Sequence, residues 1–311
     1  MQTLDPLTFP LTGLSLIEAS AGTGKTYTTL WIKELIKAQS TLVLVPSLSL
    51  LSQTLREWTF AANESFEVLC VCSDETVGKK TGQDEIIQSV HDLSFPVTAK
   101  VDEIRSFLQS PGKQVIFSTY QSSPIIAQAQ RANNAKIFDL VIADEAHRCT
   151  GEAGSAFTTV LDDTLIKSRR RLFATATPKT YTANLKKSAE ERGVEITGMD
   201  DEAVFGKVFY YLPFGEAIKR ELLTDYQVVI IGVDQPMITE WIENRELVKT
   251  ASGEATDAES LAAQIGLFKA IQDYDLKRII SFHNRVKRAE TFVSDIQNSI
   301  DFISKKQKPK G

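Results

Sequence analysis

Cysteine is scarce in this sequence. The 311 residues include three cysteines, Cys70, Cys72 and Cys149, which are too few for a disulfide framework and suit a reducing, cytoplasmic setting. A structural zinc site normally needs four ligands, and Cys70-Val-Cys72 has no second pair of cysteines to complete one. Because these two thiols stand at alternate positions of an apolar run, we expect them to be buried in a core.

Long apolar runs and a strong excess of charge are also missing. The longest apolar runs, such as Thr41–Val45 and Val228–Val233, have the length of strands, whereas a membrane span needs roughly 18–20 apolar residues. The N-terminus has no basic region followed by an apolar stretch, so we predict neither a secretory signal nor a membrane partner. The net charge of −5 argues against non-specific coating of nucleic acid, but it allows a local DNA groove built from amides and hydroxyls.

Strand-like and helix-like segments alternate along the chain, which is typical of a parallel sheet with helices on both faces, an α/β fold. Strands are predicted at Leu14–Glu18, Thr41–Val45, Phe66–Cys72, Gln114–Thr119, Phe138–Ala143 and Arg171–Thr175. Helices are predicted at Lys25–Lys37, Leu48–Trp58, Val101–Gln109 and Ile125–Ala132.

The same pattern predicts four parts of the chain. They are a complete nucleotide-binding domain (1–178), a helical or irregular connector (179–225), an incomplete second α/β unit (226–300) and a basic, disordered tail (301–311). The second unit has only two clear predicted strands, Gln227–Val233 and Arg278–Phe282. Two strands are too few for a full sheet.

The strongest local signal is the run from Ile17 to Thr26, in which a predicted strand enters a glycine-containing loop and a helix follows. The loop residues expected to bind the nucleotide are Ala21, Gly22, Thr23, Gly24, Lys25 and Thr26. The glycines let successive backbone N–H groups turn toward a phosphate, and the helix N-terminus adds partial positive charge. Lys25 would contact the β- and γ-phosphates of ATP, and the Thr26 hydroxyl would bind Mg²⁺. The alternative is a glycine-rich turn that binds nothing.

An acidic pair follows a second apolar strand. In the run Phe138 to His147, Asp144 and Glu145 stand at the strand's carboxyl end, where ligands bind in open α/β sheets. Asp144 is expected to bind Mg²⁺, and Glu145 to orient and deprotonate the attacking water. Taken alone, an Asp-Glu pair at this position could equally cap a helix.

A third strand ends in Thr175-Ala176-Thr177. The two hydroxyls could hydrogen-bond the acidic pair and sense the γ-phosphate, together with His147. The alternatives are a simple strand rich in β-branched residues and a histidine that only packs.

These motifs in this order resemble superfamily 2 helicases and translocases, and over residues 41–299 the chain resembles the motor domains of type I and type III restriction enzymes. The resemblance implies RecA-like domains, ATP hydrolysis and a DNA partner, a duplex contacted through its backbone. It also implies DNA contacts at Pro46, Ser47, Ser118, Thr119, Ser281 and Arg285. The alternative for Ser47 and Thr119 is that they cap the helices that follow.

Two departures from that family shape the functional hypothesis. The first 30 residues resemble instead the β subunit of exonuclease V, a superfamily 1 helicase. The late motif with catalytic arginines, roughly Q-x-x-G-R-x-x-R, does not occur after Phe282. We therefore expect an ATP- and Mg²⁺-binding motor module that is part of a longer protein. The alternatives are an ATP-binding module without independent turnover, completed by another chain, or a fragment of a recombination helicase.

Overall fold

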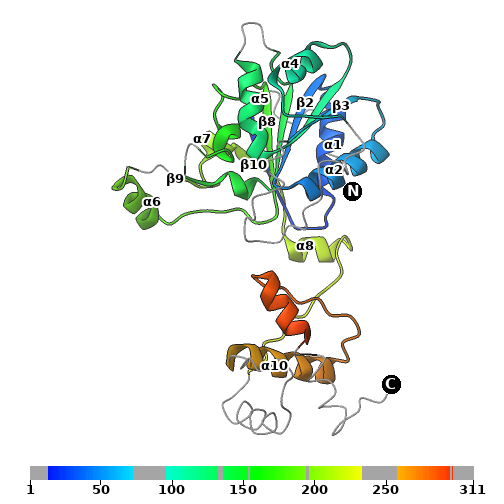
Figure 1. Ribbon diagram of the computed structural model, residues 1–311, viewed down its shortest axis with the longest axis vertical. Coiled ribbons are helices and arrows are strands. Elements are labelled where there is room, and N and C mark those ends of the chain that lie inside the picture. Colours follow the sequence, from blue (N-terminus) through cyan, green and yellow to red (C-terminus); the bar gives the residue numbers. More distant parts are fainter. Residues whose placement is uncertain are drawn as a thin grey trace. The chain divides into compact units, whose positions relative to one another are not determined.

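The structure of the protein is a computed structural model that describes residues 13–72, 96–131, 136–152, 155–193, 196–232, 258–294 and 296. The described residues up to Asp225 form one compact unit, and those from Tyr226 onward belong to a second unit (Figure 1). The predicted basic tail, residues 301–311, lies outside the described residues, as do residues 1–12.

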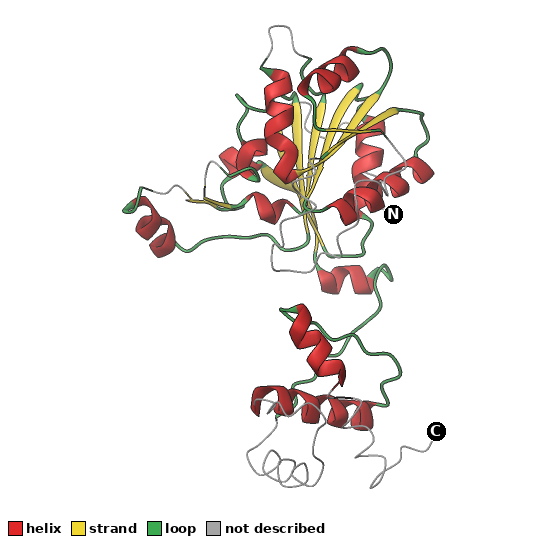
Figure 2. Ribbon diagram, in the orientation of Figure 1, coloured by secondary structure: helices red, strands yellow, loops and turns green. Residues whose placement is uncertain are grey.

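An eight-stranded sheet forms the centre of the first unit (Figure 2). In order across the sheet, the strands are β10 (Lys207–Leu212), β1 (Gly13–Ala19), β8 (Arg170–Thr175), β6 (Leu140–Asp144), β2 (Ser40–Val45), β5 (Gln114–Thr119), β3 (Glu67–Val71) and β4 (Val97–Thr98). Each pair of neighbours is parallel. The carboxyl ends of the strands therefore meet at one edge of the sheet, which we call the carboxyl edge.

Helices cover both faces of the sheet, which confirms the predicted α/β class (Figures 1 and 2). One face packs against α1 (Lys25–Leu35), α2 (Leu48–Ala61) and α8 (Phe214–Lys219), and the other against α4 (Val101–Gln109), α5 (Ser123–Gln130) and α7 (Glu202–Phe205). The alternation of side chains along a strand explains the two layers. In β2, Leu42 packs with α4 and α5, whereas Val43 packs with α1 and α2.

The segment 179–225, predicted as a connector, contributes β10 to the main sheet beside β1. Gly206, immediately before β10, has φ 75°, and a Cβ on it would clash with the backbone of Leu14 in β1. Glycine therefore permits the close approach of the two chain segments. The same segment holds α6 (Ala183–Glu190) and β9 (Ile196–Thr197), which pairs antiparallel with β7 (Gly151–Glu152).

In the second unit, the described residues include α10 (Ala258–Tyr274) and a helical stretch at 286–294. The two strand predictions in this unit are wrong for the residues that are described. Residues 227–232 and 278–282 have no regular secondary structure. An apolar run becomes a strand only when a neighbouring strand satisfies its backbone N–H and C=O groups.

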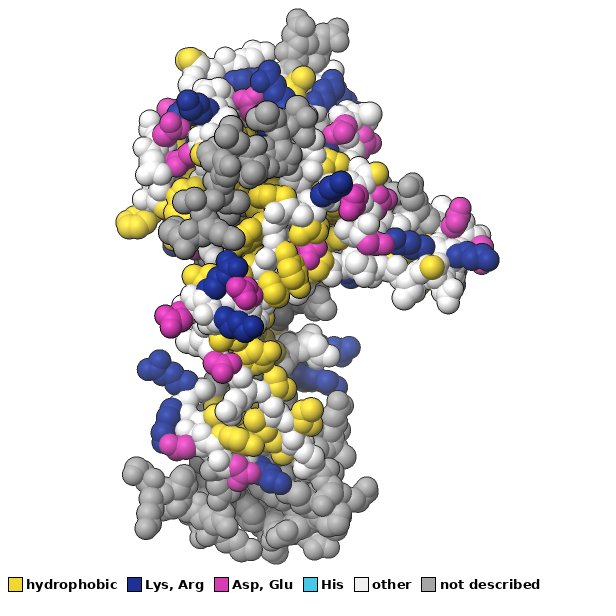
Figure 3. Space-filling model, turned by 180° about the vertical axis from the view of Figure 1, so that it is seen from behind, with side chains coloured by type: hydrophobic (Ala, Val, Ile, Leu, Met, Phe, Trp, Pro, Cys, Tyr) yellow, Lys and Arg dark blue, Asp and Glu magenta, His cyan; other side chains and the backbone are white. Residues whose placement is uncertain are grey.

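The positions of the charged residues and of the cysteines agree with what the composition indicates. Lys, Arg, Asp and Glu side chains are interspersed on the face shown in Figure 3. The three cysteines are buried, which confirms the core position predicted for Cys70 and Cys72. Burial raises the pKa of the Cys70 thiol to about 12. Among the described residues, no helix is both long enough and apolar enough to cross a membrane.

Candidate functional site

The loop after β1 has the backbone geometry expected of a phosphate-binding loop. Gly22 and Gly24 have φ values of 78° and 85°, a conformation that glycine adopts without the steric cost of a Cβ. Helix α1 begins directly after them, at Lys25. The Gly24 carbonyl accepts hydrogen bonds from the backbone N–H and the hydroxyl of Thr28, each at 3.0 Å. The loop is therefore fixed at the point where the helix starts.

The Lys25 ammonium lies within the turn of this loop. Its Nζ donates to the carbonyl oxygens of Ala19 at 3.0 Å and Ser20 at 3.2 Å. The Thr23 hydroxyl also donates to the Ser20 carbonyl, at 2.7 Å. The backbone N–H of Ser20 donates to the carbonyl of Leu212 in β10, at 3.1 Å. Strand β10, which the sequence analysis missed, thus supports the loop from the side.

Trp58 is a second support for the loop that sequence reasoning missed. Its indole Nε1 donates to the backbone carbonyl of Thr26 at 3.0 Å, although the two residues are 32 positions apart. The ring is fully buried and packs edge-on against Phe117, with 5.4 Å between the ring centroids. A buried tryptophan usually needs a partner for its N–H, and that need was the available signal. The sequence did not indicate which carbonyl would meet it.

Asp144 and Glu145 lie at the carboxyl end of β6. Asp144 is the last residue of the strand, and its Oδ1 accepts from the backbone N–H of Glu145 at 3.0 Å. Glu145 has φ 50° and ψ 46°, a left-handed conformation that is unusual for a residue with a side chain. Its side chain makes no capping hydrogen bond to the short helix η3 (Ala146–Cys149) that follows. The alternative of a simple helix cap therefore has no support here from Glu145.

The two carboxylates create a local excess of negative charge. Burial and the charge of Glu145 raise the pKa of the Asp144 carboxyl to about 6, although the hydrogen bond from the Glu145 backbone N–H and the Lys25 ammonium act in the opposite direction. A cation beside the pair would stabilise the ionised form. No cluster of three or more His, Cys, Asp or Glu side chains suited to a metal occurs among the described residues.

His147 connects the acidic pair to the end of β8. Its Nδ1 lies 3.1 Å from the Thr175 hydroxyl, 3.3 Å from the Thr177 hydroxyl and 3.4 Å from Oε2 of Glu145. Thr175 Oγ1 also accepts from the backbone N–H of Thr177 at 3.1 Å. Burial lowers the pKa of His147, although Glu145 partly opposes this change. The structure therefore brings together all four residues, which the sequence placed on two separate strands.

The residues with an implied DNA contact lie in two places. Pro46, Ser47, Ser118 and Thr119 stand at the ends of β2 and β5, on the carboxyl edge. Ser47 caps α2 by accepting from the backbone N–H of Leu50 at 3.2 Å, as the alternative interpretation predicted. Thr119 makes no such cap and donates instead to Ser122 Oγ at 3.3 Å. Ser281 and Arg285 are exposed residues of the second unit.

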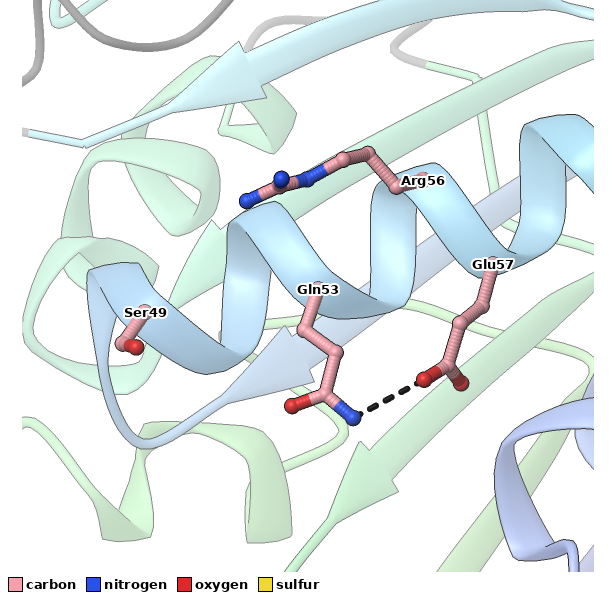
Figure 4. A pocket seen from close by; sticks show the side chains of 4 residues that line it. All are labelled: Ser49, Gln53, Arg56 and Glu57. Carbon is pink, nitrogen blue, oxygen red and sulfur yellow. Dashed lines mark hydrogen bonds between the residues drawn. The ribbon is translucent and has the colours of Figure 1, made fainter.

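A polar pocket lies on the outer face of α2 (Figure 4). It is lined by Ser49, Gln53, Arg56 and Glu57, and Gln53 Nε2 donates to Glu57 Oε1 at 2.8 Å. All four side chains come from one face of one helix, and none belongs to the predicted site. The convergence of predicted residues thus occurs at the carboxyl edge and not in this pocket.

Comparison with known proteins supports the family resemblance that the sequence motifs indicate. The family described as type III restriction enzyme, res subunit, matches residues 12–180, which is more than half of the chain. A probable helicase of African swine fever virus is 28% identical over 235 residues, which cover 75% of this chain and 23% of the viral protein. The family match includes the whole loop from Ala19 to Thr26. Nothing in these comparisons supports the predicted resemblance to exonuclease V.

Two solved structures of type ISP restriction-modification enzymes are similar. The ATP-dependent enzyme LlaBIII, bound to DNA, matches 94% of this chain with 30% identity and a TM-score of 0.73. A nuclease-deletion mutant of LlaGI, in complex with a DNA substrate mimic, matches 98% with 28% identity and a TM-score of 0.58. The chain spans between 20% and 23% of the length of these relatives. Sequence, fold and site agree, and the chain belongs to the family of type III restriction enzyme res subunits, with a motor domain of the superfamily 2 helicase type.

Proposed function

We propose that this chain is the ATP- and Mg²⁺-binding motor module of a DNA-dependent helicase or translocase of restriction-enzyme type. The observation that carries the proposal is the convergence of three sequence motifs at the carboxyl edge. Lys25 ends the loop after β1, Asp144 ends β6, and Thr175 ends β8, which lies between those two strands. ATP-driven motors need these groups together, because phosphoryl transfer depends on positioning and on charge stabilisation.

The backbone amides of Ala21, Gly22, Thr23 and Gly24, together with Lys25, would hold the phosphates of ATP. This donor set fits a phosphate group, because the two glycines have the backbone conformation that turns N–H groups inward. The Thr26 hydroxyl and the Asp144 carboxylate would hold Mg²⁺, which supplies charge neutralisation at the phosphate oxygens.

The remaining site residues would orient the attacking water and transmit the state of the phosphates. Glu145, held in a left-handed conformation at the strand end, would orient the attacking water and accept its proton. His147, Thr175 and Thr177 would report the state of the phosphates through the hydrogen bonds that join them to one another. These roles follow from the positions of the residues and from the family resemblance.

We propose duplex DNA as the partner, contacted through its phosphate backbone at Pro46, Ser47, Ser118 and Thr119, and at Ser281 and Arg285 of the second unit. Ser118 and Thr119 are buried and their hydroxyls are hydrogen-bonded. The two type ISP enzymes, whose structures contain DNA or a DNA mimic, support a DNA partner.

Further domains or a second chain are proposed to supply catalytic arginines, because the matched part of this chain covers only 20% to 23% of the length of the relatives. A cytoplasmic location is proposed as well, in keeping with three buried thiols. The boundaries of the two domains, 1–178 and 226–300, stay predictions.

The test is the rate of ATP hydrolysis with and without duplex DNA, beside a direct measurement of nucleotide binding. Lys25→Ala should abolish turnover, whereas Lys187→Ala, on an exposed lysine of α6, should leave it unchanged. DNA-stimulated turnover that Lys25→Ala removes would exclude an inert ATP-binding module. Nucleotide binding without hydrolysis, with or without DNA, would refute a self-sufficient motor.

A further inference from the structure

Tyr120 joins two parts of the carboxyl edge that are not neighbours in the sheet. It is the first residue of the short helix η2 (Tyr120–Ser122), immediately after β5. Its hydroxyl donates to the backbone carbonyl oxygen of Asp144, at the end of β6, at 2.6 Å. Strand β2 lies between β5 and β6. The tyrosine side chain therefore extends from the end of β5, past the end of β2, to the end of β6.

The carbonyl that Tyr120 contacts belongs to the peptide bond between Asp144 and Glu145. The N–H of the same peptide bond donates to Oδ1 of Asp144 at 3.0 Å. Because a peptide unit is planar, the two hydrogen bonds hold this plane at both of its polar ends. The orientation of the plane sets the direction of the Asp144 carboxylate and the left-handed turn at Glu145. Tyr120 thus helps to orient both carboxylates of the proposed site.

The tyrosine is itself held rigidly. Its side chain is fully buried, and its ring stacks on Phe157 with 5.5 Å between centroids and 26° between planes. Tyr120 and Cys149 belong to the same buried cluster. Burial raises the pKa of Tyr120 well above its usual value, so the hydroxyl remains a donor at any pH suitable for an assay.

The other end of this connection is the loop after β5. Tyr120 directly follows Ser118 and Thr119, the buried last residues of β5, where contact with DNA is proposed. The loop is tied together by the bond from Thr119 Oγ1 to Ser122 Oγ, at 3.3 Å, and is fixed to the chain beyond η3 by a bond from Ser123 Oγ to the Ala156 carbonyl, at 2.8 Å. A displacement of this loop would move the base of the tyrosine side chain.

We propose that Tyr120 is a positioning residue that links the DNA-facing loop after β5 to the carboxylates of Asp144 and Glu145. Contact of DNA with the loop then acts on the peptide plane that orients both carboxylates, without a relay through the strand that separates them. This inference rests on the proposed function, and it assigns to Tyr120 a part in the stimulation of ATP hydrolysis by DNA.

The test is Tyr120→Phe, which removes the hydroxyl and keeps the ring. The matched control is Tyr181→Phe, whose hydroxyl donates to Thr150 Oγ1 at 3.3 Å. We expect Tyr120→Phe to lower kcat for DNA-stimulated hydrolysis by about 5- to 50-fold, as the loss of one buried hydrogen bond allows. The KM for ATP should change less than about twofold, since the phosphate loop is untouched. Tyr181→Phe should match the wild-type protein in both parameters.

Thermal unfolding of each variant separates a structural effect from a positioning effect. A lower Tm with an unchanged kcat for the folded protein would overturn the inference, as would an equal loss with Tyr181→Phe. If Tyr120→Phe fails to fold, Phe157→Leu, which loosens the stacked ring and keeps the hydroxyl, should lower kcat without raising the KM for ATP. An unchanged kcat in that variant would also overturn the inference.

Failure of the proposed function gives a different result. In that case the wild-type protein itself shows no stimulation by DNA. The basal kcat of Tyr120→Phe then still tests positioning, because both carboxylates also act in basal turnover, and an unchanged basal value would refute it.

Discussion

Replacing Thr175 by valine tests whether the end of β8 couples the phosphates to the acidic pair. Valine is β-branched like threonine, so the packing around this fully buried position should change little. The hydroxyl, however, lies 3.1 Å from His147 Nδ1 and accepts from the Thr177 N–H at 3.1 Å. The substitution therefore removes two hydrogen bonds at one position and little else.

The size of the effect follows from these two contacts. A hydrogen bond contributes about 0.5–1.5 kcal/mol net, so the loss of both should reduce the free energy of unfolding by about 1–3 kcal/mol. Thr177 is exposed, and its N–H can turn to water, which places the expected value toward the lower end. If the transition state for DNA-stimulated hydrolysis loses the same free energy, the rate should fall by about 5- to 160-fold.

Urea denaturation and the rate of ATP hydrolysis at saturating DNA measure the two effects. Thr159→Val is the matched control, because Thr159 is buried in the short helix η4 (Thr158–Leu161) and its hydroxyl makes only a long contact of 3.5 Å to the Ser155 carbonyl. The control should lose less than about 0.5 kcal/mol and retain its stimulation by DNA. Full DNA-stimulated turnover in Thr175→Val would refute the coupling role, even if the protein were less stable.

Two further predictions concern stability. Lys33→Met should raise the free energy of unfolding at neutral pH by about 1–3 kcal/mol, because the lysine is 1% exposed and its Nζ has no hydrogen-bond partner among the described residues. Burial lowers the pKa of Lys33 in the folded state, so the wild-type protein should gain stability as the pH rises toward the ordinary value of 10.5. The difference in free energy of unfolding between Lys33→Met and the wild type, measured by urea denaturation, should shrink over that pH range. A constant difference would contradict the explanation, as would a similar difference between Lys187→Met and the wild type. Gly206→Ala should destabilise the fold by at least about 2 kcal/mol, because its Cβ would clash with the backbone of Leu14. Gly215→Ala, whose Cβ would meet no described atom within 4 Å, should be neutral or stabilising in the same urea titration.

The sequence predicts most of the sheet because its strands are marked locally. The six predicted strands of the first domain all occur in the structure, with bounds shifted by at most two residues. Strand β10 was missed because its neighbour is β1, nearly 200 positions earlier in the chain. Its residues, Lys207–Leu212, also carry exposed and buried side chains without clean alternation. A choice of partner at such a distance is decided by packing, which no short window of sequence contains.

The features of the candidate site also divide into those that the local sequence predicts and those that only the fold reveals. The loop from Ala19 to Lys25 was predictable because glycine spacing and backbone conformation are local properties. The contacts of Trp58 with Thr26 and of Tyr120 with Asp144 join residues 32 and 24 positions apart. Burial of an aromatic N–H or O–H signals that a partner exists. Only the fold identifies the partner.

Strand order, and not chain order, explains how one edge of the sheet can hold both the candidate nucleotide site and the proposed DNA contacts. Along the carboxyl edge, the phosphate loop of β1 comes first, then β8 with Thr175, then β6 with Asp144, and then β2 and β5 with the proposed DNA-facing loops. The acidic pair therefore stands at the boundary between the nucleotide side and the DNA side. The hydrogen bonds of His147 run from it toward β8, and that of Tyr120 arrives from β5. A change on the nucleotide side would reach the Glu145 carboxylate through His147. A change on the proposed DNA side would reach the peptide bond between Asp144 and Glu145 through Tyr120, as the proposed DNA-stimulated ATPase requires.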